Sequence, residues 1–509
     1  MDFHQRPPTL SNTFRSDESL KRVLRKYLAP DSLSAIEKHL DHVGQLASTR
    51  WLEWSREAEA NEPELIAFDP WGCRIDRIRT SSGWKNLEAA AATEGIVASG
   101  YERKYGDRSR IYQAALLYLF HPSSAFVSCP LAMTDGAARA IELYGDDQLK
   151  KGAFIHLTSR EPSKFWTSGQ WMTEKTGGSD VSGTSTIATR RENANDGFDW
   201  ELDGLKWFTS ATTSQMAMLL ARPAGAEAGS RGLSLFYTEL RDSEDRLKNI
   251  EILRLKEKLG TRALPTAELR LKGTPARLVG GEGSGVRKIA SLFNITRVYN
   301  SICATAHLRR ALDLARSYSH VREAFGKKLS DHPLHVATLA TIEDEYAKCL
   351  DLTFYVAHLL GKEDCGTASE DETILLRALT PIVKLFTAKR CVEGVSEVVE
   401  SFGGAGYVED TGIPILLRDA QVFSIWEGTT NVLSLDFLRA LEKENAGPVL
   451  MRKIESDFKP AIQGPAKESW QTIQTSMKKA ADGDREGLER DARKLAFAVA
   501  EVVALGLRG

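Results

Sequence analysis

The spacing of apolar residues changes twice along the 509-residue chain, and this change constrains the fold more than any other feature. Up to about residue 170, apolar residues recur at the three- and four-residue intervals of amphipathic helices, as in 114–120 and 137–143. Between 171 and 280, short β-prone runs alternate with turn residues, and helical spacing returns from Val286. Because the strands are grouped instead of alternating with helices, a parallel doubly wound sheet is disfavoured. We therefore predict an α+β fold that is mostly helical.

The β-prone region indicates a compact antiparallel barrel or sandwich. Its short runs are rich in aromatic and aliphatic residues and are separated by turn residues, as expected for strands. The glycine cluster at 280–285 suggests a dinucleotide-binding loop, but it lacks the βαβ context and the glycine spacing, so we interpret it as a flexible crossover into the next helix. The predicted strands lie at 199–202, 206–209, 216–221, 233–237, 250–253 and 267–271.

The pattern predicts four consecutive domains. In the C-terminal half we expect long amphipathic helices over 288–322, 334–360 and 373–401, with a polar loop at 361–371 and with Pro381 kinking or splitting the last helix. Long helices joined by short loops favour an antiparallel bundle. The domains are an N-terminal helical domain (1–170), a middle antiparallel β-barrel domain (171–280), a C-terminal four-helix bundle domain (281–441) and a helical C-terminal extension (442–509), whose uncapped apolar end suggests a longer natural chain.

Charge and cysteine content exclude several classes of function. The formal net charge is −2, so no global field attracts nucleic acid or an anionic membrane. The six cysteines are far apart, without C-x-x-C or histidine pairs at zinc spacing, and indicate reduced thiols and no metal site. No run is long enough to span a bilayer, the N-terminus lacks the features of a signal peptide, and the last three residues are not a peroxisomal signal. We expect a cytoplasmic protein, with a mitochondrial or peroxisomal location still open.

A single carboxylate, Glu427, lies between an apolar run and a Gly-Thr-Thr turn in the stretch 424–431, SIWEGTTN. Partial burial raises the pKa of such a carboxylate toward the range of a general base, and Gly428 lets a ligand approach the backbone. The alternative interpretation is an acidic residue that caps the following helix. The local sequence leaves both interpretations open.

Four further stretches contain residue types that suit a nucleotide cofactor. Residues 171–180 (WMTEKTGGSD) and 401–407 (SFGGAGY) offer backbone N–H groups to phosphates. Arg322, at the start of REAFGKKL, suits a pyrophosphate because its planar guanidinium binds two oxygens at once. In isolation, 171–180 also fits a helix cap, and the aromatic stretch 206–210 (KWFTS) also fits a core strand.

In their order along the chain, these motifs resemble the acyl-CoA dehydrogenase family of flavoproteins over roughly Ser123–Leu441. Pro333 after His332, Glu400 where glutamine is common, and the extensions at both ends resemble the AidB-like branch of that family. The resemblance implies FAD as cofactor and α,β-dehydrogenation of an acyl-CoA thioester, as in fatty acid metabolism. It also implies a homotetramer whose neighbouring chains complete each flavin site, and reoxidation by an electron acceptor protein or by oxygen.

The resemblance further implies roles for individual residues. Glu427 takes the position of the base that removes the α-proton, with Arg297 as its electrostatic partner. The family's alternative base position, directly before Arg297, holds Thr296, which cannot act as a base. Trp207 is expected to flank the flavin ring and Thr209 to hydrogen-bond near its N5 atom. The other residues expected to bind the cofactor are Met172, Thr173, Gly178, Ser179, Arg322, Phe325, His332, Glu400, Gly403, Gly404, Thr429 and Asn431.

Two other functions remain open. A related flavin oxidation, such as that of nitroalkanes, is disfavoured because it uses aspartate where this chain has Glu427. An AidB-like FAD protein with a DNA- or lipid-binding role and little turnover requires a basic surface. Residues 441–509 hold 12 basic and 11 acidic side chains, a net charge of +1, so nucleic acid binding is not expected from composition. It requires clustering of Lys478, Lys479, Arg485 and Arg490 on one face.

Overall fold

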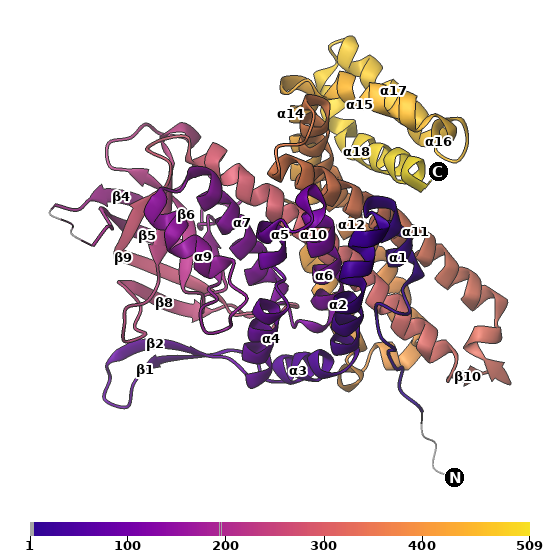
Figure 1. Ribbon diagram of the computed structural model, residues 1–509, viewed down its shortest axis with the longest axis horizontal. Coiled ribbons are helices and arrows are strands. Elements are labelled where there is room, and N and C mark those ends of the chain that lie inside the picture. Colours follow the sequence, from indigo (N-terminus) through magenta and orange to yellow (C-terminus); the bar gives the residue numbers. More distant parts are fainter. Residues whose placement is uncertain (1–4, 193, 195, 509) are drawn as a thin grey trace. The chain divides into compact units, whose positions relative to one another are not determined.

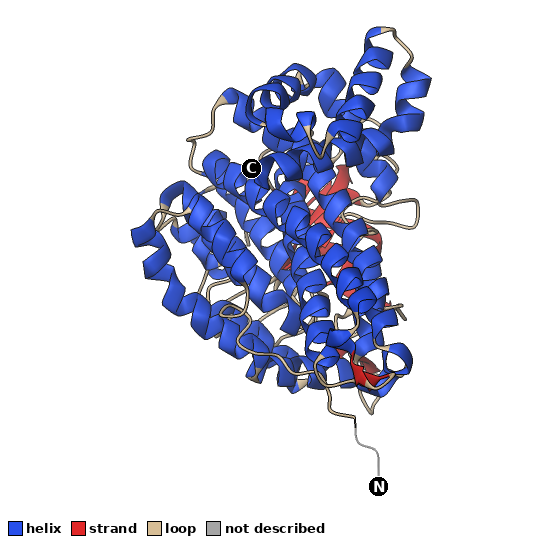
Figure 2. Cartoon of the chain, turned by 90° about the vertical axis from the view of Figure 1, so that its right-hand side faces the viewer, coloured by secondary structure: helices blue, strands red, loops and turns tan. Residues whose placement is uncertain are grey.

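The computed structural model describes residues 5–192, 194 and 196–508 (Figure 1). Its internal contacts divide the chain into two compact units. The first, which we call the helical unit, comprises the chain up to Thr49, Glu102–Pro122 and everything from Arg297 onward. The second, the sheet unit, comprises Arg50–Tyr101 and Ser123–Thr296. The predicted α+β, mostly helical fold is confirmed (Figure 2). The four sequential domain boundaries remain a prediction, because the contacts group the N-terminal helices with the C-terminal bundle.

The helical unit is built on two long helices that lie side by side, α11 and α12. A third helix, α6, is buried along its whole length, which explains its unbroken apolar composition. The helices are α1 (Glu18–Tyr27), α2 (Pro30–Ser48), α6 (Ser109–Phe120), α11 (Pro333–Asp364), α12 (Glu370–Ser401), α13 (Ile413–Phe423), α14 (Thr430–Lys443), α15 (Ala446–Asp457), α16 (Lys459–Gln463), α17 (Lys467–Ala481) and α18 (Arg485–Arg508), and a small hairpin joins β10 (Glu323–Ala324) to β11 (Lys327–Lys328).

The sheet unit combines one large sheet with six helices of its own. A further helix, α10 (Gly285–Ser319), contributes residues to both units. The helices of the sheet unit are α3 (Arg50–Ala60), α4 (Ser82–Thr93), α5 (Ala98–Glu102), α7 (Ser128–Tyr144), α8 (Asp147–Lys151) and α9 (Ala153–Leu157). The strands are β1 (Glu64–Phe68), β2 (Arg74–Arg79), β3 (Ser168–Trp171), β4 (Ile187–Arg190), β5 (Trp200–Ser210), β6 (Met216–Pro223), β7 (Ser234–Glu239), β8 (Ile250–Leu255) and β9 (Thr266–Leu278).

The large sheet closes on itself. Its strand order is β3-β6-β4-β5-β9-β7, β8 pairs with β9, and an additional β6–β7 pairing completes a ring. Most pairings are antiparallel, as predicted, but β6 pairs in parallel with both β3 and β4. The prediction of a purely antiparallel domain is therefore wrong in this part, because β3 and β4 were not recognised as strands and their long connections to β6 allow parallel pairing.

Both faces of β6 are buried. Met216, Met218 and Leu220 pack into a core shared with α7, α9 and the start of α10. The intervening residues of β6, from Ala217 to Ala221, face a second core that includes Trp171 and Trp200. Because successive side chains of a strand point to opposite faces, a strand buried on both sides has a continuous apolar sequence.

Several elements differ in extent from the predictions. The two runs predicted at 199–202 and 206–209 form one strand, β5. The predicted polar loop at 361–371 is shorter, because α11 continues to Asp364 and α12 starts at Glu370 behind a capping box made by Ser369. Helix α12 passes through Pro381 without a break.

The β1–β2 hairpin was not predicted. Its sequence, with Asp69-Pro70-Trp71-Gly72 at the turn, reads as an irregular tryptophan-rich segment. The structure shows an antiparallel ladder from Glu64 to Arg79 that attaches to β8 through Arg74, which donates to the carbonyl of Ile252 at 2.7 Å.

The C-terminal extension consists of α15 to α18. The apolar residues of α18 are buried, and this helix packs against α11, α12, α14 and α17. Among the residues that the structure describes, no helix is both long and apolar enough to cross a membrane.

Candidate functional site

Glu427 lies in the short turn that connects α13 to α14 in the helical unit. Its backbone is in the left-handed region, with φ of 56°, and Gly428 follows with φ of 104°. A Cβ on Gly428 would meet Leu433 at 2.8 Å, so the position requires glycine on two counts. The helix cap is Thr429, whose side chain makes no cap hydrogen bond. The alternative interpretation of Glu427 as the capping residue therefore does not hold.

Lys384 on α12 holds this turn. Its side chain is fully buried, and its ammonium donates to the carbonyls of Trp426 and Gly428 at 2.6 and 2.7 Å. Burial lowers the pKa of Lys384 to about 7, although the carboxylate of Glu427 opposes the shift.

Arg297 on α10 binds the same turn from another side. Its Nε donates to the backbone carbonyl of Glu427 at 3.3 Å, and its Nη1 forms an ion pair with Asp436 at 2.8 Å. Asp436 on α14 also accepts from Arg377 on α12 at 2.7 Å. Burial would raise the pKa of Asp436, but the two arginines outweigh it and lower the pKa. Three helices thus converge on the turn, and the predicted proximity of Arg297 to Glu427 is observed.

Asn300, one helical turn after Arg297, completes the support of the turn. Its Oδ1 accepts from the indole of Trp426, and its Nδ2 donates to the carbonyl of Phe423 at 3.3 Å. Thr296, by contrast, is buried, and its hydroxyl donates to the carbonyl of Phe293 within α10.

The predicted cofactor residues of the helical unit form a second group. Arg322 precedes the β10–β11 hairpin, Phe325 is 98% exposed at its tip, and the imidazole of His332 contacts the carbonyl of Ala324 at 3.0 Å. The rings of Tyr318 and Phe402 stack at 4.6 Å and so bring this hairpin close to the glycine turn that starts at Gly403.

The glycine turn fits a phosphate group. Gly403, with φ of 58°, and Gly404 have no atoms within 4 Å of an added Cβ, so their backbone faces open space. Together with the guanidinium of Arg322, this offers the positive and N–H donor groups that a pyrophosphate requires. Exposed residues complete the predicted set on this unit, namely Glu400, Thr429 and Asn431.

In the sheet unit, a buried ion pair fixes the predicted signature turn. Glu174 accepts from Lys206 at 2.8 Å and from the hydroxyls and N–H groups of Ser185 and Thr186. Burial alone would raise the pKa of Glu174, but Lys206 and the two hydroxyls outweigh it and lower the pKa to about 2. The turn is thereby locked onto β5. A backbone bond from Trp207 to the carbonyl of Thr173, at 2.9 Å, reinforces this.

The remaining candidates of the sheet unit lie around this turn. Trp207 is half-buried, with the ammonium of Lys256 at 3.7 Å and that of Lys175 at 5.0 Å from its ring centre. The hydroxyl of Thr209 is fully buried and donates to the carbonyl of Ala267, so its predicted contact with flavin N5 remains a prediction. Met172 packs into the core, which leaves its backbone for ligand contacts. Gly178 and Ser179 are exposed at the turn.

Sequence reasoning missed the two buried lysines and Glu174 as supporting residues. Lys384 stands alone in the apolar run 382–386, which is the signal that could have identified it, since a lysine at such a position requires specific partners. Its carbonyl partners, more than forty residues further along the chain, carry no such signal.

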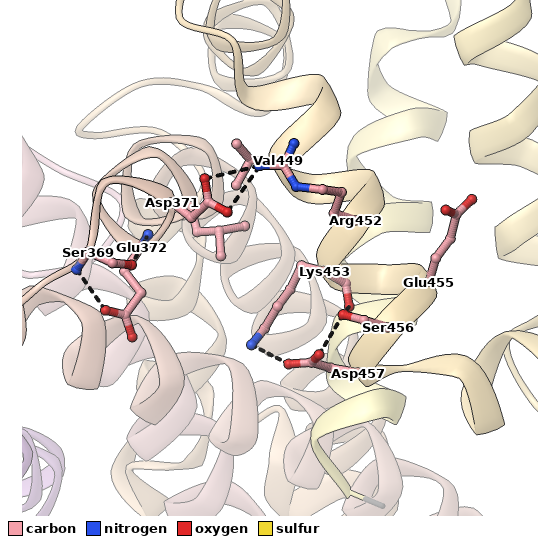
Figure 3. A pocket seen from close by; sticks show the side chains of 10 residues that line it. Ser369, Asp371, Glu372, Val449, Arg452, Lys453, Glu455, Ser456 and Asp457 are labelled. Atoms are coloured by element: carbon pink, nitrogen blue, oxygen red, sulfur yellow. Dashed lines mark hydrogen bonds and ion pairs between the residues drawn. The ribbon is translucent and has the colours of Figure 1, made fainter.

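None of the candidate residues lines a polar pocket of the helical unit. This pocket, of about 790 Å³, lies between the start of α12 and α15 (Figure 3). Its charged groups pair with one another, as Arg452 does with Asp371 and Lys453 with Asp457. In the C-terminal extension, Lys479 pairs with Asp491, which counts against a basic DNA-binding face there. Among the described residues, no histidine, cysteine and carboxylate cluster could hold a metal ion.

Three family models match the chain. The acyl-CoA dehydrogenase C-terminal domain matches residues 283–441, the acyl-CoA dehydrogenase middle domain matches 169–274, and the N-terminal domain of the adaptive response protein AidB matches 5–161. Acyl-CoA dehydrogenase family member 11 of Caenorhabditis elegans is 41% identical over 98% of this chain and 84% of its own length. AidB of Escherichia coli is 32% identical over 86% of this chain and 79% of its own length.

Two solved structures superpose closely on the whole chain. The apo form of Bd2924 has a TM-score of 0.95 with 58% identity and covers 99% of both chains. Caenorhabditis elegans ACDH-11 in complex with C11-CoA has a TM-score of 0.93 with 41% identity, covering 99% of this chain and 88% of that one.

Proposed function

Because the chain belongs to the acyl-CoA dehydrogenase family, we propose that it oxidises an acyl-CoA thioester to the 2-enoyl thioester, with Glu427 as the base. The resemblance seen in the sequence, including that to the AidB-like branch, is thereby confirmed. The single observation that carries the assignment of the base is the turn of Glu427. A glutamate whose left-handed turn is held by the buried Lys384 and Asn300 and the half-buried Arg297 is a pre-arranged group.

The chemistry requires a base that is both ionised and fixed. The α-proton of a thioester is a weak acid, so the carboxylate must meet it in a defined position. Lys384 and Arg297 bind backbone carbonyls of the turn, and Asn300 binds the indole of Trp426 next to Glu427. These contacts fix the turn that carries the Glu427 side chain. The backbone N–H of Glu427 is the family's donor to the thioester carbonyl, and the same contacts would fix it.

Members of this family are FAD-dependent, and the residues present fit that cofactor. When bound, FAD would supply the acceptor for the hydride that leaves the β-carbon. Arg322 and the Gly403–Gly404 turn would bind its pyrophosphate, while Trp207 and the Thr173–Ser179 turn would contact its ring system. In the family, Arg322 and the glycine turn act on the flavin of a neighbouring chain, and we propose a homotetramer on that ground.

The test is anaerobic addition of a panel of acyl-CoA thioesters to the purified protein, with the flavin absorbance followed over time. We expect at least one thioester to bleach the flavin. Glu427→Gln preserves the shape but cannot accept the proton, so bleaching should slow by about 10²–10⁴-fold while FAD stays bound.

Bleaching at the wild-type rate in Glu427→Gln would show that Glu427 is not the base. A protein that binds FAD but is bleached by no thioester would instead support a binding protein with little turnover. The electron acceptor follows from the same assay, by adding oxygen or an electron-transferring flavoprotein to the reduced enzyme.

A further inference from the structure

Lys384 is an unusual residue for the middle of a long buried helix. It lies on α12 one turn after Pro381, and none of its side chain is exposed to solvent. A buried ammonium costs several kcal/mol unless strong acceptors surround it, so such a residue is retained for a specific contact.

The contact of Lys384 is with a backbone turn. Its Nζ donates to the carbonyls of Trp426 and Gly428, the two residues that flank Glu427. In an extended chain, two carbonyls separated by one residue lie about 7 Å apart, so both can bind a single donor only if the chain bends sharply between them. The left-handed backbone of Glu427 provides that bend.

The left-handed conformation is costly for Glu427. A residue with a Cβ in this region is disfavoured by about 1–2 kcal/mol, so the turn persists only where its surroundings hold it. The ammonium of Lys384 gains two short, charge-assisted hydrogen bonds in this conformation alone. Arg297 adds a longer bond, of 3.3 Å, to the carbonyl of Glu427 itself.

Charged groups from several elements lie around this centre. They are Glu427 in the turn, Arg297 on α10, Arg377 on α12 and Asp436 on α14. Asp436 pairs with both arginines, whereas the carboxylate of Glu427 acts electrostatically on Lys384 and favours its charged form. The ammonium therefore acts on the carboxylate in two ways, through the backbone and through its charge.

We propose that Lys384 is a positioning residue that fixes Glu427 for proton abstraction by bridging the carbonyls of Trp426 and Gly428. This inference rests on the proposed role of Glu427 as the base. It adds that the base is positioned through its backbone by a residue on another helix, and this residue need not contact the substrate.

The test uses Lys384→Met, which keeps the length and the apolar stem but removes the charge and the donors. Lys348→Met is the matched control, because Lys348 is also a buried lysine of the helical unit, on α11, and pairs with Glu345 and Glu501 far from the turn in sequence. Both variants and the wild type are compared as FAD-loaded protein.

Two measurements are made on each protein. Hydrogen exchange of peptides covering 420–433 reports how firmly the turn is held. The rate of flavin bleaching at saturating acyl-CoA, together with the half-saturating concentration, separates proton abstraction from binding. We expect faster exchange in 420–433 and a bleaching rate lower by about 100-fold in Lys384→Met, with little change in half-saturation. Lys348→Met should match the wild type in both.

An unchanged bleaching rate in Lys384→Met would overturn the inference, whatever the hydrogen exchange shows. The proposed function would still hold if the wild type is bleached and Glu427→Gln is not. If no thioester bleaches the wild type, the proposed function fails, and unchanged exchange in 420–433 would then overturn the inference separately. Should Lys384→Met fail to retain FAD, Lys384→Gln takes its place, since its amide can still donate to one carbonyl. The same changes, smaller in size, are then expected.

Discussion

Two fully buried lysines support the two halves of the candidate machinery in different ways. Lys206 in the sheet unit pairs with a carboxylate, Glu174, and so forms a neutral buried pair. Lys384 in the helical unit is bonded to two backbone carbonyls and keeps the carboxylate of Glu427 only as a neighbour. A full ion pair fixes a turn by binding its carboxylate directly. A lysine bonded to the backbone holds a turn through its carbonyls and not through the carboxylate.

The largest effect should come from breaking the ion pair. Lys206→Met leaves Glu174 buried without its cation, and breaking a buried pair from one side costs about 3–5 kcal/mol. Hydrogen exchange of β5 peptides under increasing urea would measure the loss. The double variant Lys206→Met with Glu174→Gln should recover part of it. A double variant as unstable as the single one would mean that the pair stabilises the turn by packing and not by charge.

The pH dependence should come next. The pKa of Glu174 is about 2 in the folded protein, below that of the unfolded chain, so its stabilisation is full above about pH 4.5 and is lost as the pH falls toward 2. We expect the wild type to lose about 3 kcal/mol in this window relative to Glu174→Gln. Thermal unfolding from pH 5 to pH 2.5 measures the difference. Parallel pH profiles for the two proteins would contradict it.

Lys384 should show a pH dependence of the same sign, but at higher pH. Its folded pKa of about 7 lies below its unfolded value, so the unfolded chain binds more protons above pH 7 and stability rises with pH. Relative to Lys384→Met, the wild type should gain about 2 kcal/mol between pH 7 and pH 9. Denaturant unfolding at these two values gives the difference, and a gain of the same size in both proteins would exclude Lys384 as its source.

Gly428→Ala should give the smallest change in stability. The added Cβ meets Leu433 at 2.8 Å on a backbone with φ of 104°, which predicts a loss of about 1–2 kcal/mol. The backbone must move to accommodate the Cβ, and this displaces the Gly428 carbonyl, one of the two that Lys384 binds. Flavin bleaching should therefore slow as well. Gly447→Ala, where no atom lies within 4 Å of an added Cβ, serves as the control. Equal bleaching rates in the two variants would show that the geometry of the turn does not affect the activity.

Much of the fold could be predicted because its signals are local. Strands such as β6 and β7 are continuous apolar runs between turn residues, and α11 and α12 show helical spacing within a few residues of their observed ends. Strand direction could not be predicted, since parallel pairing of β3 with β6 depends on the connection between them and not on either sequence. The β1–β2 hairpin was missed because β2 is rich in charged residues and its ladder is only partly buried.

The candidate site divides in the same way. Glu427, Arg322 and the glycine turn are recognisable from residue type and order. Arg297 beside Glu427 is also implied by the resemblance. Lys384 and Asn300 are not, because they lie on two other helices and bind backbone carbonyls, which every residue possesses. Only the isolation of Lys384 among apolar neighbours marks it in the sequence.

The two buried faces of β6 also limit how this chain can change in length. Moving the strand by one position would turn Met216 and Met218 into the ring of strands, where Ala217 and Ala221 now fit, and would leave small residues against the helices. Overpacking on one side and cavities on the other would then occur together. Single-residue insertions or deletions in the connection before β6 should therefore be poorly tolerated. Most of the residues between Ser210 and Met216 are themselves buried, which leaves the connection little freedom to absorb a change in length.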